Sequence, residues 1–132
     1  MGYNIRLNHA QFIIKKENVK DATKALKEYA DNRFSNREFD WRKRRHLEDV
    51  LKLFCYNCDY DDDDNVNDID FNGEKLSNDE EMFNALAPYV EYGSYIEIDG
   101  EEGEKWRWFF TGKRCIQINP VISWPTPGRE LQ

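Results

Sequence analysis

The sequence predicts an α+β domain in which about three helices pack on one face of a mostly antiparallel sheet. Apolar residues alternate near the N-terminus, recur at steps of three and four in mid-chain, and alternate again near the C-terminus, where glycines mark the turns. At 132 residues the chain has the length of one ordinary domain. We expect a single domain over residues 1–124 and a Pro-rich irregular tail over residues 125–132.

The first half of the chain is expected to form one strand and two helices. In residues 3–14 apolar and polar residues first alternate, and a run of apolar residues follows. This pattern predicts a strand with a kink near Asn8. Residues 17–32 carry one helical stripe, formed by Val19, Ala22, Leu26 and Tyr29. A second helix is expected over residues 44–57, with an apolar face formed by Leu47, Val50, Leu51 and Phe54.

A short strand and a third helix are expected next. The strand is expected within residues 68–76. Ser77 and Glu80 match a capping box that begins the helix, and its buried face consists of Met82, Phe83, Leu86 and Val90. Pro88 is expected to kink the last turn of this helix.

The C-terminal part predicts a three-strand antiparallel meander. Its strands are expected at about residues 94–99, 104–111 and 114–119. One side of the middle strand carries three large rings, Trp106, Trp108 and Phe110. We expect these rings to lie in the core or to anchor an interface, because the surrounding sequence is acidic and unsuited to stacking with nucleic-acid bases.

Charge is strongly segregated along the chain, whose net charge is −7. Residues 33–46 contain six arginines or lysines against two acids, whereas residues 59–81 contain eleven acids with Lys75 as their one base. Residues 91–104 add six acids. Blocks of like charge repel one another, which favours a role toward solvent or a partner.

The acidic blocks predict a cationic partner. A row of carboxylates can occupy a basic groove made for nucleic acid, because duplex DNA carries one negative charge per roughly 1.7 Å. The residues expected to contact this partner are Asp61, Asp62, Asp63, Asp64, Asp68, Glu101, Glu102 and Glu104. The alternatives are a solvated loop and weak divalent-cation binding. Aligned from Asp59, the run lacks the glycine and the final glutamate of a calcium-binding EF-hand loop.

Two further sites are open alternatives. The basic cluster Arg42, Lys43, Arg44 and Arg45, within segment 33–46, would make the protein a nucleic-acid-binding regulator. Its position at the start of a predicted helix opposes the helix dipole, which favours a role other than helix stability. Cys55 and Cys58 have the spacing of half a zinc site, so a small zinc-binding protein is the other alternative. Two more ligands would then be required.

Residues 72–113 contain the phrases "GSYIE" and "WRWFF" after an acidic helical stretch. This segment resembles a group of small, mostly uncharacterised accessory proteins of phages and mobile elements. The resemblance implies an inhibitor of host defence, for example an anti-CRISPR protein, and a basic host partner such as a Cas-type nuclease. It covers about a third of the chain and includes no known catalytic residue.

Several function classes are disfavoured by the sequence. No nucleophile elbow or glycine-rich phosphate loop is present, and the two histidines lack metal-ligand spacing, so we do not expect an enzyme. The odd number of cysteines, three, favours a reducing compartment. No apolar run approaches the length of a membrane span, and no signal-peptide pattern occurs, so we expect a cytoplasmic protein without a membrane partner.

Overall fold

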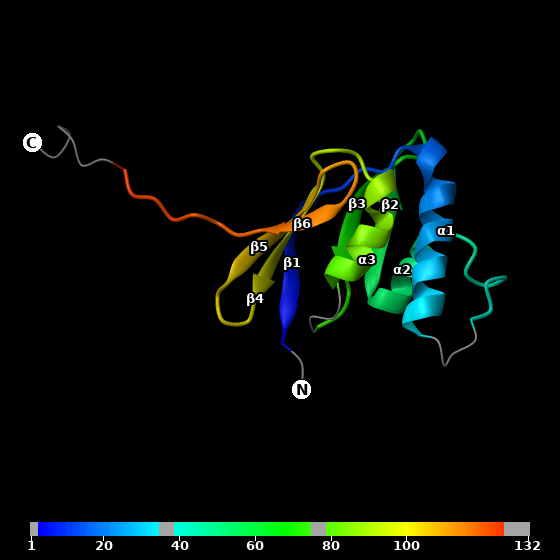
Figure 1. The fold of residues 1–132 in the computed structure, drawn as a ribbon, viewed down its shortest axis with the longest axis horizontal. Helices are drawn as coiled ribbons and strands as arrows, with labels where there is room; N and C mark the ends of the chain where they lie inside the picture. Colours follow the sequence, from blue (N-terminus) through cyan, green and yellow to red (C-terminus); the bar gives the residue numbers. More distant parts are fainter. Residues whose placement is uncertain (1–2, 35–38, 75–78, 126–132) are drawn as a thin grey trace, which may run out of the picture.

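The computed structural model describes residues 3–34, 39–74 and 79–125, and it confirms the α+β class (Figure 1). The helices are α1 (Lys16–Arg33), α2 (Leu47–Leu51) and α3 (Asp79–Leu86), with short 3-10 turns η1 (Lys52–Phe54) and η2 (Ala87–Tyr89). The strands are β1 (Ile5–Gln11), β2 (Tyr56–Tyr60), β3 (Val66–Phe71), β4 (Tyr95–Gly100), β5 (Lys105–Phe110) and β6 (Cys115–Ile118).

Four strands form an antiparallel sheet in the order β1-β4-β5-β6. Its last three strands are the predicted meander, and each lies within about a residue or two of its expected bounds. The turns contain Gly103 and Gly112, both with φ near +90°, a conformation that glycine adopts without steric cost. The predicted kink of the first strand is present, because the pairing of β1 with β4 shifts register between Leu7 and His9.

Strands β2 and β3 form a separate antiparallel hairpin beside β1. Two backbone contacts hold it there. Ile14 and Val66 exchange N–H to carbonyl bonds of 2.9 and 3.0 Å, and the N–H of Ile5 donates to the carbonyl of Glu74 at 2.8 Å. β3 therefore follows the edge of β1 that does not pair with β4, which extends the strand layer on that side.

The predicted length of the second helix was wrong. The observed helix α2 ends at Leu51, and the chain continues through η1 to Cys55, whose φ of 66° lies in the left-handed region. The following residues form β2, in which Tyr56 and Cys58 are buried alternately. Pairing with β3 satisfies this backbone and buries both side chains, so tertiary contact overrides the helical pattern of the preceding residues.

The third helix also ends earlier than its apolar pattern predicts. α3 stops at Leu86, and Pro88 lies in the 3-10 turn η2 that follows. Proline has no N–H and its ring clashes with the preceding turn, so it cannot continue an α-helix. Val90 is still buried, as expected. The predicted cap residue Ser77 lies outside the described residues.

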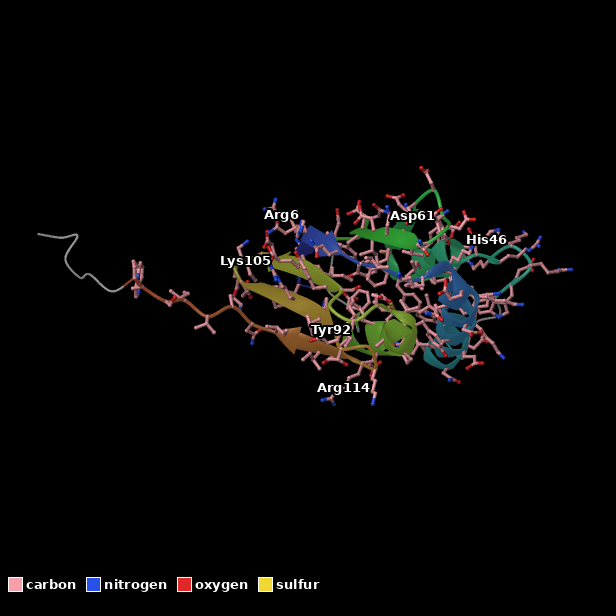
Figure 2. The ribbon with its side chains drawn as sticks, turned by 90° about the horizontal axis from the view of Figure 1, so that it is seen from above. Arg6, His46, Asp61, Tyr92, Lys105 and Arg114 are labelled. Carbon is pink, nitrogen blue, oxygen red and sulfur yellow. The ribbon has the colours of Figure 1, made fainter. Side chains whose placement is uncertain are left out.

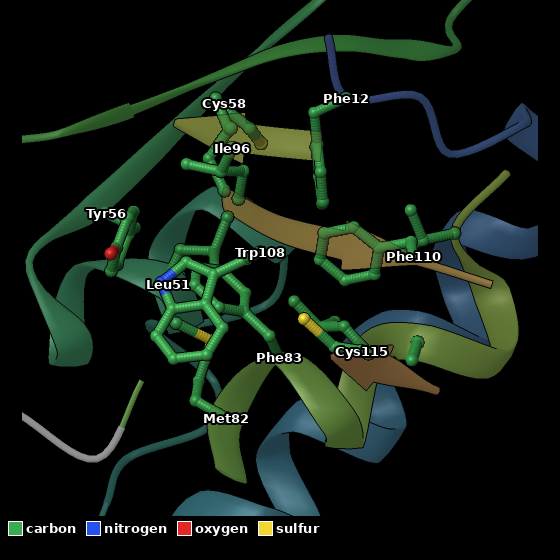
Figure 3. Packing of buried hydrophobic residues seen from close by; sticks show 14 of the residues in the cluster. Phe12, Leu51, Tyr56, Cys58, Met82, Phe83, Ile96, Trp108, Phe110 and Cys115 are labelled. Atoms are coloured by element: carbon green, nitrogen blue, oxygen red, sulfur yellow. The ribbon is translucent and has the colours of Figure 1, made fainter. Parts of the chain in front are cut away.

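One hydrophobic core lies between the helices and the strands (Figure 3). Trp106, Trp108 and Phe110 point into it, as predicted, with at most 8% of their surface exposed. The ring of Phe83 on α3 contacts both Trp108 and Phe110, with centroid distances of 6.2 and 5.8 Å. Figure 2 shows α1 and α3 on one side of the strands and Arg6 and Lys105 on the other. No helix or strand of the described residues covers the outer side of the four-stranded sheet.

The chain leaves the four-stranded sheet after β6. Residues 119–125 have no regular secondary structure and extend away from the sheet (Figure 1). Three large apolar side chains in this stretch are more than 80% exposed: Val121, Ile122 and Trp124. The proline at position 120 has no N–H, which prevents continued pairing with β5 at that residue.

Candidate functional site

The outer side of the β2–β3 hairpin is acidic. Asp59 and Asp68 lie directly opposite each other, and Asp70 lies opposite Asn57. Residues 56–71 contain no lysine or arginine, and within the described residues none of the three carboxylates forms an ion pair. Like charges in directly opposed positions destabilise a hairpin. We call residues 56–71 the acidic hairpin.

The turn of the acidic hairpin is organised by Asp61. Its carboxylate accepts the N–H of Asp63 at 2.9 Å, the N–H of Asn65 at 2.9 Å and the Asn65 amide at 3.2 Å. Desolvation acts in the opposite direction, but the hydrogen bonds from Asn65 and Asp63 lower the pKa of Asp61. Asp61 therefore holds the turn, whereas Asp62, Asp63 and Asp64 are exposed to solvent.

The acidic turn also meets the N-terminus of α1. The side-chain oxygen of Asn65 accepts the N–H of Lys16 at 2.8 Å, which satisfies one of the free donors of the first helical turn. Negative charge is favourable at this end of a helix because the helix dipole is positive there. The local structure of the turn thus explains part of the aspartate run. It does not explain the charges of Asp59, Asp68 and Asp70, which lie on the strands.

The second predicted acidic turn lies elsewhere. Glu101, Glu102 and Glu104 follow β4, and the N–H of Asn4 donates to Glu101 at 2.7 Å. The Tyr3 hydroxyl donates to Glu104, and this hydrogen bond lowers the pKa of Glu104. These contacts lie before β1, whereas the acidic hairpin meets Ile14 after β1. The two acidic turns therefore lie at opposite ends of β1 and do not form one patch (Figure 1).

The basic cluster is dispersed by its own contacts. Arg42 pairs with Asp40 at 3.1 Å, and Arg44 donates to the backbone carbonyl of Asp49 at 2.8 Å. Lys43 is exposed. Arg45 borders a groove of about 980 Å³ together with four lysines of α1, which are Lys16, Lys20, Lys24 and Lys27.

Sequence reasoning missed this lysine row, although its spacing of three and four residues was visible. At 100° per residue the four positions fall within about 80° of the helix circumference. The groove is nevertheless mixed in charge, since four acids also line it: Glu17, Asp21, Glu48 and Asp64. The cluster of residues 42–45 is therefore only one component of a mixed surface.

The cysteines are placed differently from one another. Cys55 is exposed at the end of η1, whereas Cys58 on β2 and Cys115 on β6 are buried. Burial raises the pKa of both Cys58 and Cys115 to about 12, which keeps these thiols protonated. In the part of the chain that the structure describes, no group of three or more His, Cys, Asp or Glu side chains is arranged to hold a metal ion.

Native protein should therefore react with a thiol-specific reagent at one cysteine per chain, Cys55, and at all three after denaturation. The thiol count can be measured by absorbance at about pH 8, near the ordinary pKa of cysteine. A Cys55→Ser variant supplies the control and should show no fast reaction. Fast labelling that appears only after a chelator is added would instead support zinc at Cys55 and Cys58.

A buried carboxylate lies under the first turn of α3. Asp79 is 3% exposed, and the hydroxyl of Tyr56 donates to it at 2.9 Å. Burial raises the pKa of Asp79, although the Tyr56 hydrogen bond acts against this shift. The pair connects β2 to α3 through the core. It is a structural contact that no sequence pattern indicated, since its members are 23 positions apart.

The comparisons with known proteins found no match to a family model, to a curated protein or to a solved structure. Among the helices of the described residues, none combines the length and the apolar character that crossing a membrane requires. Fold and surface together define an α+β domain with an acidic hairpin at one end and a sheet side that no described helix or strand covers.

Proposed function

We propose that this protein is a non-enzymatic binding protein whose acidic hairpin docks on a basic surface of a nucleic-acid enzyme and inhibits it. One observation carries the proposal: Asp59 faces Asp68 across the hairpin, and within the described residues neither has a cationic partner. This arrangement costs stability in the free protein. A basic partner would neutralise the two carboxylates, so the loss of their repulsion would favour binding.

The hairpin has the properties of a phosphate mimic. Its exposed carboxylates lie on two strands and their turn, and they are Asp59, Asp62, Asp63, Asp64, Asp68 and Asp70. A protein groove that binds nucleic acid presents lysines and arginines to a row of negative charges. The resemblance of residues 72–113 to phage accessory proteins favours a host-defence nuclease, such as a Cas-type enzyme, as the target in the host cytoplasm.

The test compares two triple variants with equal loss of charge. The hairpin variant is Asp62→Asn, Asp63→Asn and Asp68→Asn, which leaves the turn-forming Asp61 intact. The control variant is Glu28→Gln, Asp31→Asn and Glu91→Gln, at exposed positions outside the hairpin. Proteins captured from a host lysate by the wild type and the control, and not by the hairpin variant, are identified by mass spectrometry.

The captured nuclease is then purified for kinetics and activity. We expect the hairpin variant to associate at least about tenfold more slowly at low salt, because charges at an interface rim mainly raise the association rate. The difference should shrink at about 1 M salt, where the Debye length is about 3 Å. Wild-type protein should inhibit the nuclease. Equal slowing of both variants would show a dependence on net charge alone, and full capture by the hairpin variant would refute the proposal.

A further inference from the structure

We propose that the outer side of β4 and β5 binds single-stranded nucleic acid. Tyr95 and Phe109 lie directly opposite each other on these two central strands. They alternate with Ile96, Trp108 and Phe110, which point into the core, so their rings lie on the uncovered side. This inference goes beyond the proposed function and does not depend on it, because the acidic hairpin belongs to other strands.

Aromatic rings and a guanidinium group gather around this pair. The ring of Tyr92, whose surface is 72% exposed, contacts Phe109 edge-on at 5.9 Å between centroids. His9 lies 5.7 Å from Tyr95, and the guanidinium carbon of Arg107 lies 4.2 Å from the Tyr95 ring centre. Unstacked bases stack on aromatic side chains and on arginine planes, and both surfaces are present here.

The cations on this side suit a phosphate backbone. Arg107 is paired with Glu97 at 3.0 Å, so this acid is neutralised locally. Lys113 and Arg114 are exposed in the turn before β6, and neither forms an ion pair within the described residues.

This turn lies against Tyr92. A side-chain carbon placed on Gly112 would be 3.7 Å from the Cβ of Tyr92, and Figure 2 shows Tyr92 and Arg114 near each other. Lys113 and Arg114, which form no ion pair with any described residue, therefore lie in a turn that borders the exposed rings.

Single-stranded nucleic acid fits these features better than an acidic protein does. Carboxylates of an acidic protein would satisfy Lys113 and Arg114 but would leave the exposed rings without a stacking partner. A single strand supplies phosphates for the cations and free base faces for the rings. A duplex holds its bases stacked inside the helix, so its bases could not reach Tyr92 and Phe109 without being flipped out.

The experiment measures fluorescence anisotropy of labelled single-stranded DNA and RNA of about 12 nucleotides, a length within the usual range of such sites. Measurements start at about 50 mM salt, where backbone contacts are strong. Tyr92→Ala should weaken binding about tenfold, the loss expected for one stacked base. Lys113→Gln with Arg114→Gln should lower the slope of log affinity against log salt by about 1.4, since each single-strand phosphate contact contributes about 0.7.

Matched controls locate the site on the chain. Trp124→Ala removes a ring that is even more exposed than Tyr92 from the tail, and Lys20→Gln with Lys24→Gln removes two exposed cations from α1. Neither control should change the affinity. A circular dichroism melt verifies that each variant is folded, and the lysine–arginine variant tests the site independently of Tyr92.

Four results would overturn the inference. They are no binding by the wild type at low salt, an equal loss from Trp124→Ala, a loss confined to the α1 lysine variant, and equally strong competition by polyglutamate. The third result would assign nucleic acid to the α1 groove, and the fourth would assign this side of the sheet to an acidic protein.

Discussion

Replacing Phe83 by alanine should lower the free energy of unfolding by about 3–5 kcal/mol, as large aromatic truncations in a core do. Phe83 is fully buried on α3, and its ring contacts Tyr56 on β2 at 5.2 Å as well as Trp108 and Phe110 on β5. The ring thus joins the hairpin, the helix and the sheet (Figure 3). Urea denaturation followed by tryptophan fluorescence measures the loss.

The control for this variant is Phe109→Ala, which removes the same side chain from the opposite side of the sheet. Phe109 is only partly buried, so we expect a loss of about 0.8–1.5 kcal/mol, half of the transfer free energy of about 1.5–3 kcal/mol for a fully buried ring and without the cavity term that Phe83→Ala adds. Equal losses at the two positions would show that the outer side is packed as tightly as the core, contrary to the uncovered sheet described above.

Tyr56→Phe should cost about 1–3 kcal/mol at pH 7, because it leaves the buried carboxylate of Asp79 without its hydroxyl donor. The cost should depend on pH. Burial already raises the pKa of Asp79, and loss of the Tyr56 hydrogen bond should raise it further. A carboxyl group with a raised pKa contributes stability that is fully present below its unfolded pKa and is lost as pH rises through the folded value. The deficit should therefore shrink as pH falls through the two folded pKa values of Asp79, and it should be smallest near pH 4, the ordinary value of an aspartate.

Asp79→Asn tests the same contact from the other side. The variant has no charge to bury, and its amide oxygen can still accept the Tyr56 hydroxyl. At pH 7 it should be at least as stable as the wild type, with a difference that disappears toward pH 4. Thermal unfolding of the wild type, both single variants and the double variant across this pH range measures the coupling. A Tyr56→Phe deficit that does not change with pH would show that the ionised carboxylate is not its source.

The parts of the fold that depend on neighbouring residues were predictable. The meander followed from alternation interrupted by glycine turns, and the stripe of Val19, Ala22, Leu26 and Tyr29 predicted α1. The kink of the first strand near Asn8 was also predicted. These features arise within a few residues of the chain, where turn chemistry and side-chain period act directly.

Other features depended on partners distant in sequence. β2 was missed, because Tyr56 and Cys58 become strand residues only through pairing with β3 across the acidic turn. The two acidic turns were expected to contact one partner together, but β1 separates them. The lysine row beside Arg45 required the packing of α1 against α2.

The sequence by itself determined the α+β class, the meander and the inward direction of Trp106, Trp108 and Phe110, because each follows from local period and turn residues. Only the tertiary structure decided which charges share a surface and which rings stay outside the core. The sequence shows which residues are charged or aromatic. The side of the sheet on which each side chain lies depends on long-range strand pairing and on which side the helices cover. This placement decides whether Tyr95 and Phe109 are core residues or a binding surface.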